Sequence, residues 1–337
     1  MIRLAWRQFR AEASIGFGAL VVAAVVLAIT GPYLMTVYRT APNQLSSTDH
    51  GLQVAVSVLL LLTPALVGIF FGAPLIAREL ETGTYRLAFT QSVTRRRWAV
   101  VKLALLGLAG SLLAGSLSLM VAWWANPIDI TNQNRFTPSL FGILGIVPFG
   151  YGLFAFALGA TTGLLFRKTL PAMATTLVGF VGARLAVTFW IRPHFEAPLR
   201  MSKPLAPGMG FGFLSTPSGL SVTVGPPSIA NAWSLSAEIV DKTGNAPTSA
   251  YLSRACRGLA GPVQSVGRIA GGPHTQPVVH GSIPACIANL ASKFHAVITY
   301  QPASRCWPFQ IYETVLFVVL ALALAGPSLW RMRRRLT

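Results

Sequence analysis

Long uninterrupted runs of apolar residues dominate the chain, and short polar segments separate them. A helix needs about 20 consecutive apolar residues to cross the hydrocarbon core of a bilayer. Six runs reach that length, so the pattern predicts an all-α membrane protein with six transmembrane helices. The predicted spans are Ile15–Val37, Val54–Ile76, Trp98–Trp124, Phe141–Phe166, Pro171–Ile191 and Phe309–Leu329.

Positive charge is distributed unevenly over the polar segments between these runs. The chain holds 27 Lys and Arg against 9 Asp and Glu, a net charge of +18. Fifteen basic residues flank the spans on one side, whereas the short loops of the other side hold only Arg39 and Arg135. Because cytoplasmic loops carry an excess of Lys and Arg, we expect both termini in the cytoplasm, a plasma-membrane location and no nucleic-acid partner. The fifteen are Arg3, Arg7, Arg10, Arg78, Arg86, Arg95, Arg96, Arg97, Lys102, Arg167, Lys168, Arg331, Arg333, Arg334 and Arg335.

The polar segments divide the chain into cytoplasmic, membrane and extracytoplasmic regions. The first 14 residues have an amphipathic pattern that predicts a helix lying on lipid headgroups at the cytoplasmic interface, although a plain charged flank would also fix the orientation. The predicted regions are the interfacial helix 1–14, spans one to five over 15–191 with a cytoplasmic loop at 77–97, an extracytoplasmic domain 192–308, span six over 309–330 and a basic cytoplasmic tail 331–337.

The predicted extracytoplasmic domain is rich in Pro, Gly, Ser and Thr and holds all three cysteines. Its pattern predicts mixed structure, with a strand at Gly219–Gly225 and a helix near Ala285–Ile298. Disulfides persist on this oxidising side of a membrane. We favour a bond between Cys256 and Cys286, which flank one Gly- and Pro-rich stretch, although the sequence does not exclude a bond to Cys306.

Sequence motifs for catalysis are missing. There is no G-x-x-x-x-G-K-[ST] phosphate loop, no G-x-S-x-G, no H-E-x-x-H and no paired C-x-x-C. We therefore expect a non-catalytic chain that binds no cofactor and no metal of its own. Glu313 is the only carboxylate inside a predicted span, so a proton-coupled carrier is the weaker interpretation.

Two opposite charges fall inside predicted spans at similar depth. Arg184 lies in the outer part of the fifth span and Glu313 near the outer end of the sixth. An unpaired charge at such depth costs a few kcal/mol on insertion scales. We predict that the two side chains pair near an external gate, although each reaching the headgroups separately remains an alternative.

The loop from Arg78 to Lys102 carries the most informative polar pattern. Gly83 is a good helix stop, and Thr84 is able to cap a short helix with apolar side chains. The loop resembles that of ABC transporter membrane subunits of the type-two exporter family, whose pattern is R-E-x-x-x-G-T, then Leu, Thr or Pro, Ser/Thr-Arg and Lys. Within the loop, the run T-Q-S-V-T-R-x-x-W resembles more specifically the sequences of actinobacterial members. The matching residues are Arg78, Glu79, Gly83, Thr84, Leu87, Thr90, Thr94, Arg95 and Lys102.

This resemblance implies that the loop holds a coupling helix that rests on a separate ABC ATP-binding subunit. It also implies a working unit of two ATP-binding subunits, which bind ATP and Mg, and two permeases as a homodimer. An ordinary basic loop is the alternative to coupling. The residues implied to couple to the ATPase are Arg78, Glu79, Glu81, Gly83, Thr84, Tyr85, Leu87, Phe89 and Arg95.

The function implied is that of a permease subunit in an exporter that moves a drug-like, lipid or peptide substrate outward. The large 192–308 segment departs from the usual family plan. An ABC-driven mechanical or sensory complex that acts through this domain without translocation therefore stays open. Gly159 and Gly163 form a small-xxx-small step in the fourth span, which fits packing within the chain better than a dimer interface.

Overall fold

The computed structural model describes the chain in two compact units, which are treated separately below. The first unit is Met1–Phe195 with Cys306–Thr337, and the second is Glu196–Arg305. The predicted interfacial helix and the loop residues Gly83, Thr84, Tyr85, Leu87 and Phe89 lie outside the described residues. The described residues are 18, 21–33, 36, 47–82, 95–132, 136, 138–206, 209–216, 219–225, 229, 232–256 and 282–335.

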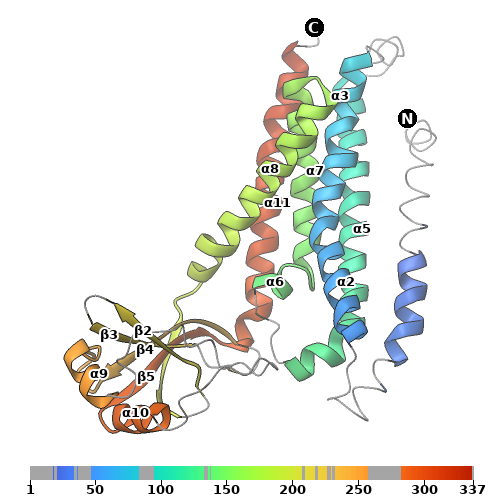
Figure 1. The fold of residues 1–337 in the computed structure, drawn as a ribbon. Coiled ribbons are helices and arrows are strands. Elements are labelled where there is room, and N and C mark those ends of the chain that lie inside the picture. Colours follow the sequence, from blue (N-terminus) through green and yellow to red (C-terminus); the bar gives the residue numbers. More distant parts are fainter. Residues whose placement is uncertain are drawn as a thin grey trace. The chain divides into compact units, whose positions relative to one another are not determined.

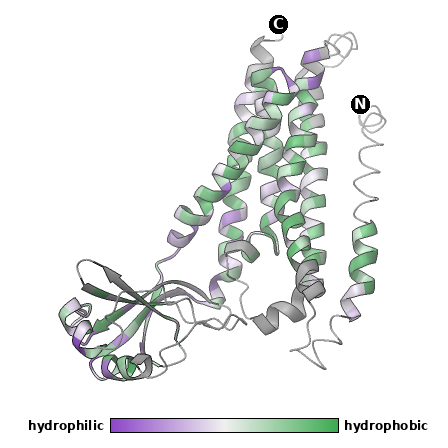
Figure 2. Ribbon diagram, viewed as in Figure 1, coloured by the Kyte–Doolittle hydropathy of each residue, from purple (hydrophilic) through white to green (hydrophobic). Residues whose placement is uncertain are grey.

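Five helices in the described part of the chain are long and apolar enough to cross a membrane. They correspond to the second to sixth predicted spans, and Figure 2 shows apolar residues along their length. A shorter apolar helix, Val21–Tyr33, lies within the first predicted span. The elements of this unit are α2 (Ser47–Leu66), the π-helix η1 (Val67–Gly72), α3 (Ala73–Thr82), α5 (Arg95–Asn132), α6 (Pro138–Phe141), α7 (Val147–Phe166), α8 (Thr169–Ala186), the π-helix η2 (Val187–Ile191), the 3-10 turn η3 (Arg192–His194) and α11 (Cys306–Arg335).

The fourth span is the central helix of this unit. Helix α7 contacts α2, α3, α5, α8 and α11, and it is the most buried of the five candidate spans. A side chain at Gly163 would come within 2.6 Å of the Ala73 carbonyl oxygen, and one at Gly68 would come equally close to the Ala155 oxygen. Gly159 packs in the same way against Gly68 and Ala73. The small-xxx-small step therefore packs within the chain, against the second span.

The fourth span begins later than the apolar run predicts. The helix starts at Val147 rather than Phe141, because Gly142–Ile146 form a turn in which Gly145 has φ +82°. Irregular backbone at membrane depth needs hydrogen-bond partners from the protein. Ser118 donates to the Ile143 oxygen at 2.7 Å. The Gln310 amide donates to the Leu144 oxygen at 3.0 Å and accepts from the Ile146 N–H at 3.1 Å.

The second unit is a small α+β domain built on two antiparallel sheets (Figure 1). One sheet has the order β1-β5-β4 and the other is the hairpin β2-β3. Its elements are β1 (Leu199–Pro204), β2 (Phe211–Thr216), β3 (Gly219–Val224), β4 (Trp233–Asp241), α9 (Ser249–Ala255), α10 (Ser282–Ala291) and β5 (Phe294–Gln301).

The predicted strand at Gly219–Gly225 is confirmed as β3, whereas the predicted helix at Ala285–Ile298 is wrong in its second half. Helix α10 ends at Ala291, and the residues from Phe294 onward form the central strand β5. Its alternating pattern suits a strand, and β1 and β4 pair with it on both edges.

A disulfide joins the two helices of this unit. It links Cys256, directly after α9, to Cys286 in α10, across 30 residues of sequence. Both cysteines are buried in the apolar core beside Leu252 and Leu290. This is the pair favoured from the sequence, and Cys306 is outside it.

Candidate functional site

A buried ion pair lies inside the first unit, between α11 and the end of the helix Thr169–His194, which forms the fifth predicted span. Glu313 and Arg192 both have no solvent exposure. Arg192 Nε donates to Glu313 Oε2 at 2.7 Å, and Arg192 Nη2 donates to Oε1 at 2.8 Å. This two-pronged geometry is the strongest arrangement of a guanidinium and a carboxylate. It ties η3 to α11.

Three further side chains surround this pair. The hydroxyl of buried Tyr151, in α7, donates to Glu313 Oε1. Thr188, in η2, accepts from Arg192 Nη2 at 3.4 Å, and the guanidinium carbon of Arg192 lies 4.4 Å from the centre of the Phe141 ring. The cluster thus joins α7, the helix Thr169–His194 and α11.

Arg184 lies on the other side of Tyr151 and is half-buried. Its guanidinium donates to the Leu61 oxygen at 3.1 Å and to the Gly142 oxygen at 3.3 Å. Its central carbon stands 4.7 Å from the centre of the Tyr151 ring. Arg184 therefore anchors α2 and the turn before α7, and Tyr151 separates it from the carboxylate.

The predicted partner of Glu313 needs correction for this reason. In the described part of the chain, Glu313 forms its ion pair with Arg192, and Arg184 is linked to it through Tyr151. Sequence reasoning missed Arg192 because it directly follows Ile191, where the apolar run ends. One signal was available, because Arg184, Thr188 and Arg192 recur every four residues, which places them near one face of a helix.

A second polar contact joins the C-terminal end of α3 to the N-terminal end of α8. Glu81, near the end of α3, accepts from the Thr169 hydroxyl at 2.7 Å and from the Thr169 N–H at 3.2 Å. The side-chain and backbone hydrogen bonds from Thr169 lower the pKa of the Glu81 carboxyl. Thr169 is the first residue of α8, so the carboxylate satisfies a free N–H of that helix end and faces its positive dipole.

The turn at this end is short. Arg167 adopts the left-handed conformation, with φ 53°, and its N–H bonds to the Gly163 oxygen, which ends α7. Lys168 is extended, and α8 begins one residue later. Glu81 thus attaches the end of α3 to the hairpin between α7 and α8.

The other predicted coupling residues are placed by their backbone. Arg78 is the last residue of the helix that forms the second predicted span. Glu79 lies within α3, and Arg95 is the first residue of α5. The segment from Gly83 to Thr94 connects α3 to α5 and lies outside the described residues. Among the residues that the structure describes, no group of three His, Cys, Asp or Glu side chains is arranged to hold a metal ion.

Comparison with known families decides what kind of membrane protein this is. Residues 17–192 match the family model described as ABC-2 membrane transporter related, and they make up more than half of the 337 residues. The chain belongs to this family. It is an ABC-2 type permease subunit and a multi-pass protein of the plasma membrane. No curated protein and no solved structure matches it.

The family match ends at Arg192, the residue that pairs with Glu313. The ABC-2 permease therefore keeps one partner of its buried ion pair inside the matched region and the other outside it. The unit Glu196–Arg305 and helix α11 both lie beyond the match. ABC-2 permeases are typically non-catalytic membrane subunits that work with a separate ATP-binding subunit.

Proposed function

We propose that this permease serves an ATP-driven exporter, in which ATP hydrolysis on a separate subunit drives a drug-like, lipid or peptide substrate outward. ATP and Mg²⁺ would be bound by that ATP-binding subunit. The observation that carries the proposal is the contact between Glu81 and Thr169, at the base of the proposed coupling loop.

This contact gives the coupling loop a mechanical connection to several helices. The loop over 77–97 leaves α3 and enters α5. Glu81 binds the first residue of α8 just before the loop departs. A push on the loop by an ATP-binding subunit would therefore act on α3, on α5 and, through Glu81, on the α7–α8 hairpin.

The helix of the fifth predicted span connects this contact to the buried ion pair. It runs as one helix from Thr169 to His194. At a rise of about 1.5 Å per residue, Thr169 and Arg192 are separated by roughly 35 Å. Motion of the α8 start would reach the cluster of Arg192, Glu313 and Tyr151, which we propose as part of the external gate.

The assembly we propose contains two copies of this permease and two ATP-binding subunits. Six spans with both termini in the cytoplasm would place the coupling loop beside the ATPases and residues 192–308 outside. The interfacial helix 1–14 would lie on cytoplasmic lipid headgroups.

A mechanical or sensory role without translocation is the second candidate. The observation that favours it is the separate compact unit Glu196–Arg305, with its own apolar core and disulfide. Such a domain would be able to engage an envelope partner while ATP hydrolysis moves the spans.

The test is ATP-dependent accumulation of labelled candidate substrates in proteoliposomes that hold the permease and its ATP-binding partner. Thr169→Val removes the hydroxyl that binds Glu81 and should uncouple ATP hydrolysis from accumulation. Thr175→Val is the matched control, because the exposed Thr175 hydroxyl bonds only its own helix, at the Pro171 oxygen, in the described residues. Equal coupling in both variants would remove the support for a mechanical connection through the Glu81–Thr169 contact. ATPase activity without any accumulation would favour the mechanical role.

A further inference from the structure

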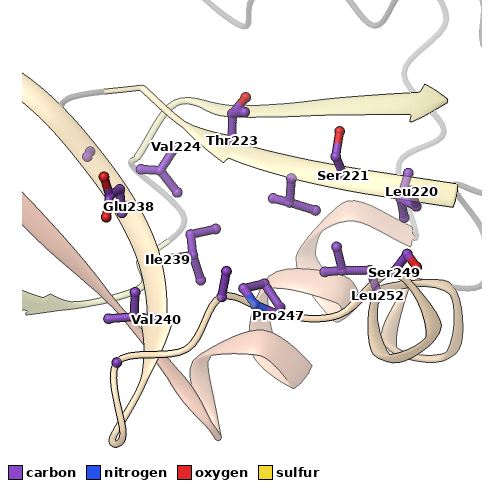
Figure 3. A pocket seen from close by; sticks show the side chains of 14 residues that line it. Leu220, Ser221, Thr223, Val224, Glu238, Ile239, Val240, Pro247, Ser249 and Leu252 are labelled. Carbon is purple, nitrogen blue, oxygen red and sulfur yellow. The ribbon is translucent and has the colours of Figure 1, made fainter. Parts of the chain in front are cut away.

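The unit Glu196–Arg305 holds a cavity that the proposed function does not use. The cavity lies between β3, β4 and the start of α9 and has a volume of about 590 Å³ (Figure 3). This is within the range of about 300–1,000 Å³ that is typical of ligand sites. Leu220, Val224, Ile239 and Leu252 line its apolar part.

The edge of strand β4 that pairs with no described strand forms one wall. Four consecutive residues of β4, Ala237–Val240, line the cavity. Successive side chains of a strand point to opposite faces, so a run of four means that the backbone edge itself borders the space. Among the described strands, β4 is at the end of the order β1-β5-β4, and only one of its edges is paired.

The backbone groups on that edge can be assigned. The Asp241 N–H bonds to the Asn245 oxygen, in the turn that follows β4 and away from β5. Because the N–H and C=O of alternate residues point to the same edge of a strand, those of Ile239 and Ala237 face the cavity too. They offer hydrogen bonds to an added strand.

One carboxylate stands beside this edge. Glu238 is exposed, and in the described part of the chain it forms neither a hydrogen bond nor an ion pair. Its side chain points to the face opposite to Ile239. A neighbouring strand would therefore place one side chain next to Glu238 and its two flanking side chains toward the apolar cavity.

We propose that this cavity binds an extended peptide segment that adds a strand to this edge of β4. The segment would carry a basic residue opposite Glu238 and apolar residues on either side of it. Main-chain hydrogen bonds would provide affinity and the cavity would select the side chains, which is how strand addition works in general. This site is independent of whether the permease exports a substrate.

The test uses the full-length permease in lipid nanodiscs and the peptide Thr-Val-Lys-Val-Thr-amide, which carries fluorescein on its N-terminus so that the Lys side chain stays charged. Fluorescence anisotropy should show saturable binding. A peptide with Glu in place of Lys should bind about twofold to thirtyfold more weakly, because a cross-strand charge pair of about 0.2–1 kcal/mol turns from attraction into repulsion. A fully N-methylated peptide, which cannot pair with the strand edge, should not bind.

Variants locate the site. Glu238→Lys should reverse the preference between the Lys and Glu peptides. Glu238→Gln should weaken the Lys peptide, while Ser236→Lys, which changes the net charge by the same amount on an exposed position outside the cavity lining, should have a smaller effect. Ser249→Trp should block the cavity from its exposed rim. Hydrogen exchange at the Ala237 and Ile239 amides should slow when peptide binds.

The proposal is overturned by an unchanged peptide preference in Glu238→Lys, or by equal binding of the N-methylated peptide. It is also overturned if binding is saturable but the two amides gain no protection. That result would place the peptide elsewhere on the permease or in the lipid.

Discussion

Removing one partner of the buried Arg192–Glu313 pair should destabilise the permease strongly. Glu313→Gln would leave the Arg192 guanidinium without solvent and without its carboxylate, since both side chains are completely buried. Breaking a buried ion pair in this way typically costs about 3–5 kcal/mol, because an uncompensated charge stays behind. Arg192→Gln should cost a similar amount.

Double mutants test whether Glu313 is coupled to Arg192 or to Arg184, the partner expected from the sequence. Arg192→Gln together with Glu313→Gln removes both charges, so its loss should be well below the sum of the two single losses. Coupling energies of about 1.5–7 kcal/mol are measured for close charge pairs by such cycles. Arg184→Gln should show a weaker coupling to Glu313→Gln, because Arg184 bonds to backbone oxygens of Leu61 and Gly142.

The measurement is the free energy of unfolding from SDS titration of purified permease in mixed micelles, followed by circular dichroism. Each of the three single variants and both double variants needs the same detergent and the same salt. If the coupling between Arg184 and Glu313 equals or exceeds that between Arg192 and Glu313, the arrangement described here is refuted.

Three further predictions follow from other parts of the chain. The hydrogen bonds from Thr169 lower the pKa of Glu81, so the stability that this contact contributes is present above the ordinary pKa of a glutamate and is lost as the pH falls through the lowered value. The protection of the Thr169 amide, its exchange rate relative to an unstructured peptide at the same pH, should therefore fall over that acidic range and should not change in Glu81→Gln. Gly163→Leu should reduce folded yield because its side chain would meet the Ala73 backbone. Gly182→Leu should be tolerated, because in the described part of the chain no atom lies within 4 Å of the position that its Cβ would take. Cys256→Ser should destabilise the Glu196–Arg305 unit by roughly 3 kcal/mol on the loop-entropy model, measured as its denaturation midpoint, with peptide mapping as the check on pairing.

Hydropathy predicted the long helices well and their irregular parts poorly. A window of apolar residues marks what lipid will accept, and this is why the second to sixth spans were found. The same window includes Phe141 and Gly142, whose side chains are equally apolar or absent. The helix begins only at Val147 because Ser118 and Gln310 hydrogen-bond to the turn that precedes it, and those residues lie 25 and more positions away in sequence.

The candidate site shows a similar limit. Glu313 was found because a lone carboxylate inside a span demands a partner. Its partner depends on how far the fifth helix continues past its apolar run. An arginine at the end of such a run is usually interpreted as a residue that lies at the membrane surface. Glu81 was selected because it lies in the predicted coupling loop, but its contact with Thr169 depends on the hairpin between α7 and α8.

The π-helical turn η2 sets the angle around the helix axis between Arg184 and Arg192. In a straight α-helix, eight residues overshoot two full turns by about 80°, so Arg192 would stand about 80° around the helix axis from Arg184, at the other side of the shared face. The N–H of Arg192 bonds to the Val187 oxygen, five residues back, and this wider turn takes up part of the excess rotation. The length of Val187–Ile191 therefore matters more than its composition. Apolar substitutions should be accepted at the exposed residues Phe189, Trp190 and Ile191, whereas one deleted residue would turn Arg192 by about 100° and separate it from Glu313.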